Sequence, residues 1–524
     1  MFYFLFLSLC IVHIILIFLY IYFDSLKKTM IIQYQRKLIW NHQKSQLPTT
    51  IPSQKFIIII IKEKLIYKAI MSNSNLKLIK KDPNKALRKL VIPILILNFI
   101  ITMYTITDGI WISGINSAAI VAVATIIPLN SILIGISGGL GIGTTSAVGY
   151  YIGADDRKSA ILSCKNALFL FLIFSIILTA LFLIILKPLL ISYPIGNKAI
   201  NEGLNYGIPL FLGSFTYVFS SGLFGIFRGS GETKKPLYAL GTSFLINIIF
   251  DPVFIYVFNW GVAGAATISV LSSLLSVIML SYWLFHKKTI YPDFNDYKFK
   301  FDTNIIKRIL NVGIPATFEV LIISIAATIL IYFTNIAGGN HGVAVHSLGY
   351  RIYQFSLIPI SSICAALVIV VSNAYGDKNI DNIKKVFKYS CKLTISFGLL
   401  SILIVALFSD QLSLIFAFSK DSASLLPDIS LFIRIIFLSL PFMGLGLSST
   451  FVFQGLSKGT YSLVWTLIRE FILSLFFVYF FGFIMNWGLI GIWIGFVIGK
   501  SSSTIFTYLH TNHYINKLKI SKDN

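Results

Sequence analysis

Charge is what this 524-residue chain lacks most. Asp, Glu, Lys and Arg make up only 12% of it, whereas soluble globular chains carry about 25%. Hydrophobic residues make up 56% and form long uninterrupted runs, for example 169–186 and 271–285. Since a helix needs roughly 20 apolar residues to cross the hydrocarbon of a bilayer, the sequence predicts an all-α polytopic membrane protein, with no room for a separate soluble domain.

Cysteine motifs are lacking as well. The four cysteines lie in apolar segments with no CxxC spacing and no nearby His, so they support neither a disulfide framework nor a metal site. They are Cys10, Cys164, Cys364 and Cys391. A membrane-embedded prenyl-transferring enzyme would need paired Asp-rich metal motifs, and Asp155-Asp156 has no matching partner. We expect no cofactor and no enzyme, and this enzyme class is the least favoured alternative.

A phosphate-binding loop is not present either. The glycine-rich segment 135–143 lacks the preceding strand and the Lys-Ser/Thr pair that a nucleotide site needs. Small residues at helical spacing instead let helices approach each other closely in lipid. We interpret this segment as a packing surface.

The net charge of +23 raises nucleic acid as a partner, but most basic residues lie in short loops between apolar runs. From Met71 on, loops on one side carry 25 Lys and Arg residues, and loops on the other side carry only Lys187, Lys198 and Lys420. Cytoplasmic loops show this excess. We therefore expect no nucleic-acid partner, a multi-pass protein of the plasma membrane, and cytoplasmic termini for the 71–524 chain, including the C-terminus.

Residues 1–70 need a separate interpretation. Residues 1–23 form one apolar run followed by Lys27 and Lys28, which is too long and too poor in cleavage sites for a signal peptide. Met71 opens a polar stretch that leads into the first repeat. We predict that the working protein starts at Met71 and that 1–70 is translated upstream sequence. An extra N-terminal transmembrane helix is the alternative.

Twelve apolar segments follow, six in each half of the chain. We predict helices over residues 88–112, 118–150, 159–186, 200–224, 236–258, 262–285, 306–337, 343–373, 385–409, 426–453, 461–484 and 488–512. Four landmarks recur at offsets of 222 to 227 positions, namely Val91-Ile-Pro93 with Gly313-Ile-Pro315, Gly153 with Gly376, Phe227-Arg-Gly with Phe453-Gln-Gly, and Asn259-Trp-Gly with Asn486-Trp-Gly. This predicts two pseudo-symmetric six-helix lobes in the same orientation, an N-lobe over 71–298 and a C-lobe over 299–524.

Three carboxylates lie inside apolar segments, where a charge at the bilayer centre costs at least about 2.5–3.5 kcal/mol and usually faces a cavity or a partner. They are Asp108, Asp251 and Glu319. Tyr104 precedes Asp108 by one turn, so its hydroxyl can donate to the carboxylate. The position of Asp108 inside an apolar segment favours a functional role for this residue. The alternative is that it lies near the outer end of its helix and meets water.

Asp251 follows Asn247 on the same helical face, and Pro252 frees a backbone carbonyl nearby. Carboxylate, amide and carbonyl oxygens suit either Na⁺ or a shuttled proton. The alternative is that Asp251 only caps or kinks its helix. Glu319 lies one turn after Pro315. It either has a function or pairs with a basic residue of another helix, and the sequence leaves both open.

Three segments in order resemble the multidrug and toxic compound extrusion (MATE) family of exporters. They are Phe227-Arg-Gly-Ser-Gly-Glu-Thr-Lys-Lys-Pro236, Asn247-Ile-Ile-Phe-Asp251-Pro-Val-Phe-Ile and Gly261-Val-Ala-Gly-Ala-Ala266. The segment 107–114 fits the family as well, and the likeness covers about residues 82–510. Glu232 stands where the family usually has Asp.

The resemblance implies two lobes around a cavity and export driven by entry of H⁺ or Na⁺. It also implies an N-lobe cation site at Asp108, Asn247 and Asp251, with a hydroxyl from Ser269 and Thr267 close by. Glu319 does not match that site, and we keep it as a substrate or cation contact in the C-lobe.

We therefore predict a monomeric, cation-coupled antiporter that exports cationic amphipathic drugs or toxic organic compounds. The nearest alternative is a lipid-linked oligosaccharide flippase, which would need basic residues in its cavity to bind a pyrophosphate. The mostly acidic intramembrane charge of the N-lobe favours the exporter. The substrate and the choice between H⁺ and Na⁺ are not fixed by the sequence.

Overall fold

The computed structural model describes residues 74–286, 294, 297–414 and 424–518. The predictions for residues 1–70, including the extra N-terminal helix, lie outside the described residues. Within the described part the secondary structure is helical, and no strand occurs there. This follows from the solvent, because backbone N–H and C=O groups in lipid must be satisfied within the chain, and a helix satisfies them within one segment.

The first half begins with a short helix and continues with six membrane-spanning segments. They are α3 (Ser74–Lys81), α4 (Pro83–Ser113), α5 (Ser117–Gly153), α6 (Arg157–Ser192), α7 (Asn197–Leu212) with α8 (Ser214–Gly229), α9 (Lys234–Pro252) with the π-helix η1 (Val253–Val257), and α10 (Gly261–Phe285).

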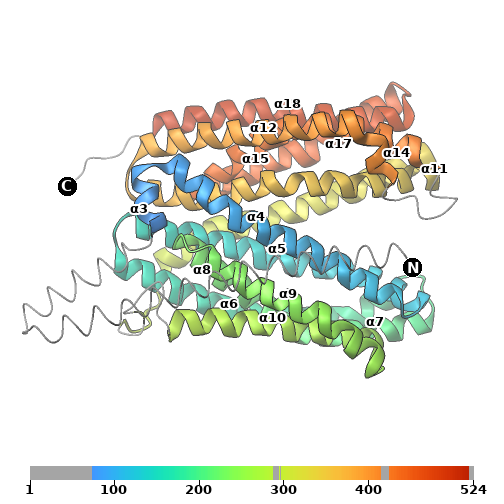
Figure 1. Cartoon of the computed structure of the whole chain (residues 1–524), viewed down its shortest axis with the longest axis horizontal. Helices are drawn as coiled ribbons and strands as arrows, with labels where there is room; N and C mark the ends of the chain where they lie inside the picture. The colour runs from blue at the N-terminus through green and yellow to red at the C-terminus, as the bar shows by residue number, and fades with distance from the viewer. Residues whose placement is uncertain (1–73, 287–293, 295–296, 415–423, 519–524) are drawn as a thin grey trace, which may run out of the picture. The chain divides into compact units, whose positions relative to one another are not determined.

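The second half repeats this series. Its elements are α11 (Thr303–Gly376), α12 (Ile380–Ser413), α14 (Leu426–Ile436) with η3 (Phe437–Ser439) and α15 (Leu440–Gly455), α16 (Gly459–Thr466) with η4 (Leu467–Leu473), α17 (Ser474–Tyr479) and η5 (Phe480–Ile484), and α18 (Gly488–Lys517). Figure 1 shows the first-half helices α6 to α10 on one side of the bundle and α12 to α18 on the other, with α4, α5 and α11 between them.

The described residues contain twelve spans, as predicted. Ten helices are long and apolar enough to cross a membrane, and α7 and α8, bent by 42°, together form one more. The 74 residues of α11 are two helices divided at Gly339, whose φ is 58°. A single helix of that length would be about 110 Å long, more than three times the hydrocarbon thickness of roughly 30 Å.

The backbone carries the predicted duplication. Residues with positive φ recur at matching places in the two halves, Asp155 with Lys378 and Asn259 with Asn486. The π-helices η1 and η5 end two spans at equivalent positions. The lobe boundary near residue 298 falls in the segment between α10 and α11, where residues 287–293 and 295–296 lie outside the described part, so the boundary itself stays a proposal.

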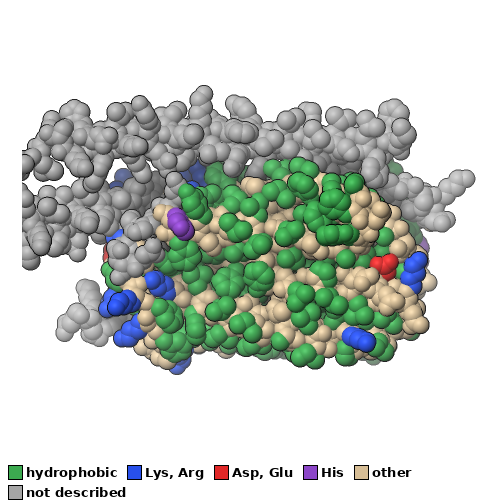
Figure 2. Space-filling view, turned by 90° about the horizontal axis from the view of Figure 1, so that it is seen from below, with side chains coloured by type: hydrophobic (Ala, Val, Ile, Leu, Met, Phe, Trp, Pro, Cys, Tyr) green, Lys and Arg blue, Asp and Glu red, His purple; other side chains and the backbone are tan. Residues whose placement is uncertain are grey.

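The surface of the bundle fits a lipid environment. Figure 2 shows hydrophobic side chains over the middle of the visible face and most of its Lys and Arg side chains at one end. Large apolar side chains on the helices are exposed, for example Ile184 and Leu407, whose exposed fractions are 72% and 64%. Exposed apolar surface on this scale marks contact with lipid rather than water.

Glycine contacts hold the two halves together. A Cβ added at Gly139 of α5 would lie 2.7 Å from the carbonyl oxygen of Gly313 in α11, and one at Gly143 would collide with the carbonyl of Ile309. Helices that approach so closely gain dispersion contacts that lipid cannot replace. The glycine-rich segment is therefore a packing surface, as predicted.

A lysine of α3 connects equivalent loops of the two halves. Lys80 Nζ lies 2.7 Å from Asp155 and 3.1 Å from Asp377. We call this end of the bundle the basic end. Partial burial lowers the pKa of the Lys80 ammonium, but the hydrogen bonds to both carboxylates outweigh that effect and the pKa is raised. Lys80 therefore keeps its charge at physiological pH, although half-exposed pairs of this kind contribute only about 0–1 kcal/mol.

Gly143→Ala should destabilise the protein, because the new methyl group needs the space of the Ile309 carbonyl and overpacking typically costs about 1–3 kcal/mol. Gly138→Ala is the matched control in the same helix, since nothing lies within 4 Å of a Cβ there. It should leave stability unchanged or slightly raised. Thermal unfolding of the purified full chain measures both, and equal melting temperatures for the two variants would contradict this packing.

Candidate functional site

The N-lobe polar cluster begins in α9. Asn247 and Asp251 lie one turn apart, and Asn247 Nδ2 donates to Asp251 Oδ1 at 3.2 Å. The same amide group lies 3.4 Å from the hydroxyl of Ser269 in α10. All three side chains are buried. Asp251 also lies at the junction where the α-helix α9 ends and the π-helix η1 begins.

Asp108 of α4 completes this cluster. Its carboxyl group lies close enough to Asp251 and Ser269 to interact with them electrostatically. Tyr104, one turn earlier on α4, lies close to Ser269 and to Asp108. The structure thus brings together five of the six N-lobe residues that the sequence singled out, from three different helices.

Three oxygens of this cluster lack a donor. Asp108 Oδ1, Asn247 Oδ1 and Asp251 Oδ2 are buried and have no hydrogen-bond partner in the described residues. A buried polar atom without a partner costs about 1–3 kcal/mol, and more if it is charged. Two carboxylates at close range also repel each other. A proton or a small cation between them would relieve both costs.

Thr267 takes a different position. Its hydroxyl donates to the carbonyl of Ala263, one turn earlier in α10, at 2.7 Å, and the described residues show no contact between it and the carboxylates. Two tyrosines that could not be selected from the sequence lie near the cluster. Tyr206 of α7 and Tyr217 of α8 are close enough to interact electrostatically with Asp108 and Asp251. No local spacing connects α7 or α8 to α4, so periodicity could not find them.

Glu319 belongs to a second polar cluster, in the C-lobe. It is buried in α11, and Gln454 of α15 donates to its Oε2 at 3.2 Å. Ser462 and Thr466 of α16 also lie close to Glu319, and the charge of Arg469 acts on it from further away. Its direct partner is therefore an amide, and the basic residue lies beyond it. Gln454 was visible in the sequence only as part of the repeat landmark Phe453-Gln-Gly.

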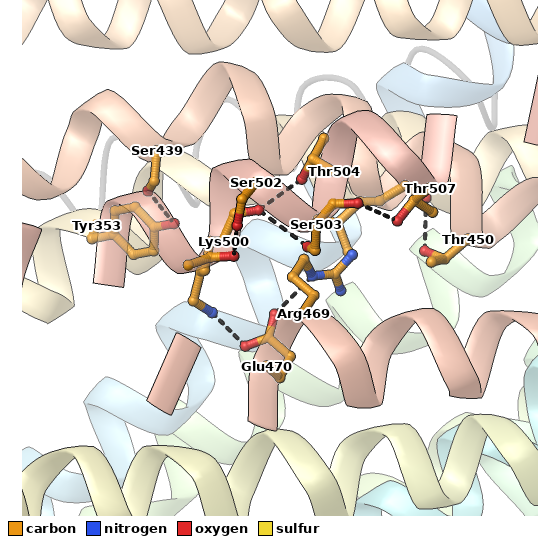
Figure 3. Close-up of polar contacts among 12 residues, drawn as sticks. Tyr353, Ser439, Thr450, Arg469, Glu470, Lys500, Ser502, Ser503, Thr504 and Thr507 are labelled. Carbon is orange, nitrogen blue, oxygen red and sulfur yellow. Dashed lines mark hydrogen bonds and ion pairs between the residues drawn. The ribbon is translucent and has the colours of Figure 1, made fainter. Parts of the chain in front are cut away.

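Next to this cluster lies a buried ion triad (Figure 3). Arg469 Nε donates to Glu470 Oε1 at 2.9 Å, and Lys500 of α18 pairs with Glu470 Oε2. All three side chains are at most 7% exposed. Arg469 and Glu470 lie in the π-helix η4, and π-turns are frequent at functional sites. With Glu319 ionised, two carboxylates balance two cations.

A cavity of about 380 Å³ lies between the two halves. It is lined by residues of α4, α5, α8, α11 and α15. Ile101 of α4 lines it and lies two turns before Asp108, about 10 Å along the helix axis and on the same face. The cavity therefore adjoins the helix that carries the N-lobe acid.

These features define a membrane-embedded transporter with an interior cavity and buried ionisable groups on either side of it. Comparison with known proteins gives the same class. The family profile described as MatE matches residues 93–253 and 315–480, once in each half. The chain belongs to the MatE family. The relatives that it matches are named as transporters and not as enzymes, among them multidrug resistance and export proteins and an FAD transporter.

Two curated relatives and one solved structure illustrate the likeness. The probable multidrug resistance protein YoeA of Bacillus subtilis is 26% identical over 323 residues, which are 60% of this chain and 68% of that protein. The probable multidrug resistance protein NorM of Bacillus licheniformis is 22% identical over 442 residues, which are 82% of this chain and 95% of that one. A MOP superfamily transporter from Pyrococcus furiosus superposes with a TM-score of 0.81 at 31% identity, over 85% of this chain and 99% of that one. It is described as having a binding pocket of reverse polarity.

Asp155 and Asp156 have structural roles. Asp156 caps α6 by accepting from Ser159 N at 3.0 Å, and Asp155 pairs with Lys80. The described residues hold no group of three His, Cys, Asp or Glu side chains that could bind a metal ion.

Glu470→Gln should destabilise the protein by about 3–5 kcal/mol, because it leaves the cations of Arg469 and Lys500 buried without a counter-charge. The double variant Glu470→Gln/Lys500→Met should recover part of that loss. Asp410→Asn removes an exposed carboxylate that pairs with Arg434 and serves as the control, with an expected change of no more than about 1 kcal/mol. Thermal unfolding compares the three. A Glu470→Gln protein as stable as the control would show that the triad is not needed for stability.

Proposed function

We propose that the chain is a cation-coupled antiporter, driven by H⁺ or Na⁺, that exports small amphipathic or toxic organic compounds. The observation that carries this proposal is the set of three buried, donor-free oxygens on Asp108, Asn247 and Asp251. Buried acceptor oxygens that lack a donor recruit a proton or a hard cation. Ser269 and Tyr104 add hydroxyl groups, and Thr267 stays a more distant candidate.

Coupling requires that the ion and the substrate favour different states. A ligand shifts an equilibrium only by its differential affinity for the two states. An ion that neutralises Asp108 and Asp251 changes the charge on α4, and α4 also lines the cavity through Ile101. Neutralisation then changes how α4 packs, and the cavity releases its substrate. Glu319 is the matching candidate for a substrate or cation contact in the C-lobe.

The sidedness is part of the proposal. We propose that the basic end, with α3 and the loop at Asp377, faces the cytoplasm, as the positive-inside rule indicates. The C-terminal end of α18 then lies on the cytoplasmic side as well. We also propose that the protein acts as a monomer in the plasma membrane. The acidic N-lobe cluster favours substrates with a cationic portion.

A lipid-linked oligosaccharide flippase is the second candidate. The observation in its favour is Arg228, a basic residue that lines the cavity. A pyrophosphate normally needs several such donors, and the cavity has a single one among its described lining residues. The exporter therefore fits better.

Ethidium efflux from proteoliposomes that contain the full chain tests the proposal. Imposed pH and Na⁺ gradients are applied separately, and efflux should follow one of them. Asp108→Asn should reduce gradient-driven efflux to the rate of protein-free liposomes while the melting temperature stays within a few degrees, because the neutral amide no longer exchanges a cation.

Asp410→Asn makes the same chemical change at an exposed ion pair and should export like the unchanged protein. Normal export by Asp108→Asn would refute the coupling assignment. Lack of gradient-driven efflux in a folded, inserted protein would favour the flippase or a narrow-substrate transporter.

A further inference from the structure

The cavity between the halves has one charged lining residue, Arg228, near the end of α8. The other polar groups on its described walls are neutral, namely Asn98 and Thr102 of α4, Thr145 of α5 and Ser361 of α11. Apolar side chains such as Phe451 complete the wall. An amphipathic molecule fits such a lining, which joins apolar surface to a few polar groups.

Arg228 has no counter-charge in the described residues. Its Nε is buried without a hydrogen-bond partner, and its guanidinium lies over the ring of Phe224 at 5.9 Å. Arg228 is half-buried, and an aromatic face stabilises a cation by only about 0.5–2 kcal/mol, which does not replace the hydrogen bonds that its buried Nε lacks. The guanidinium therefore keeps unused donors in the cavity wall.

The internal repeat shows why the counter-charge is missing. Arg228 and Gln454 occupy equivalent places in the landmarks Phe227-Arg-Gly and Phe453-Gln-Gly. In the C-lobe, Gln454 donates to Glu319. The residue equivalent to Glu319 in the N-lobe is Leu97, by the offset of the Pro93 and Pro315 landmarks, and Leu97 is buried. The Gln454 amide thus donates to a carboxylate within the protein, although its Oε1 has no partner in the described residues, whereas the N-lobe position has a stronger donor and no acceptor.

The neutral neighbours leave recognition to Arg228. The hydroxyl groups of Thr102, Thr145 and Ser361 donate to carbonyls of their own helices, so their protons are already used. A guanidinium binds a carboxylate with two parallel hydrogen bonds, which makes it a specific receptor for planar anions.

We propose that this cavity is the substrate site and that Arg228 pairs in it with an anionic group of the substrate, of the carboxylate class. With the acidic N-lobe cluster along α4, the preferred substrate is a zwitterionic amphipathic compound rather than a pure cation. This inference rests on the proposed export function and specifies its substrate class.

Two dyes with the same body provide the test. Tetramethylrhodamine with a free carboxylate is zwitterionic, and its methyl ester is a cation of nearly equal size and apolar surface. Fluorescence anisotropy of each dye with the purified full chain gives the two dissociation constants. The unchanged protein should bind the free acid at least about tenfold more tightly, because a buried, hydrogen-bonded charge pair is lost in the ester.

Arg228→Gln should remove this preference by weakening the binding of the free acid, while the cationic ester binds no more weakly than to the unchanged protein. Arg228→Lys keeps the charge without the fork of donors and should retain part of the preference. A structural role of Arg228 would weaken both dyes equally. Equal binding of the two dyes by the unchanged protein, or a preference that survives Arg228→Gln, would overturn the inference.

Two further measurements distinguish a substrate site from a lipid site, and the substrate class from export itself. A lipid phosphate offers similar anion chemistry, so a short-chain phospholipid is titrated as competitor. Arg228-dependent binding of that lipid, with no preference between the dyes, would assign the site to lipid and overturn the inference. Gradient-driven efflux of the ester without a carboxylate preference would refute the substrate class alone, whereas efflux of neither dye nor ethidium would refute export.

Discussion

The close approach of α5 to α11 is the contact on which the rest of this structure depends. Lipid tails are as apolar as leucine, so helices in a bilayer are not driven together by the hydrophobic effect and must gain from tight packing. Gly139 and Gly143 let the backbone of α5 lie directly against that of α11. This contact joins the two halves and leaves α4 and α8 facing the second part of α11, where the cavity forms.

Buried charge is distributed unevenly over this frame. Although Arg469 Nη1 and Gln454 Oε1 have no partner in the described residues, the C-lobe pairs its buried carboxylates within the protein, since Glu470 pairs with Arg469 and Lys500 and Glu319 accepts from Gln454. The N-lobe does not, because Asp108 and Asp251 keep oxygens without donors. An ion that comes and goes can complete a site of the second kind but has no comparable opening in the first. We therefore assign coupling to the N-lobe and a largely structural role to the triad.

The architecture could be predicted from the sequence because its signals are local. Apolar runs gave twelve segments whose predicted ends lie within several residues of those in the structure, and landmarks such as Asn259 and Asn486 revealed the repeat. Asn247 and Asp251 could be paired because helical spacing places them on one face. Asp108 was selected as a carboxylate inside an apolar segment, and the family resemblance joined Asp108 and Ser269 to this pair from other helices.

Contacts between distant helices could not be predicted in this way. The pairing of Lys500 with Glu470 joins α18 to η4, and hydrophobic periodicity says which residues face inward but not which of them meet. Arg228 stands at the end of a span next to a basic loop, and a charge there resembles a cytoplasmic residue rather than part of a cavity wall. Thr267 lies near Ser269 in sequence, yet its hydroxyl bonds to its own helix.

The most direct test of the central claim is to measure ion binding itself. The purified full chain is equilibrated with radioactive sodium or titrated for proton uptake, with and without a saturating substrate, and compared with Asp251→Asn. The account predicts that one cation binds per chain, that substrate displaces it, and that Asp251→Asn abolishes this binding. Cation binding that persists in Asp251→Asn, or that substrate does not affect, would contradict it.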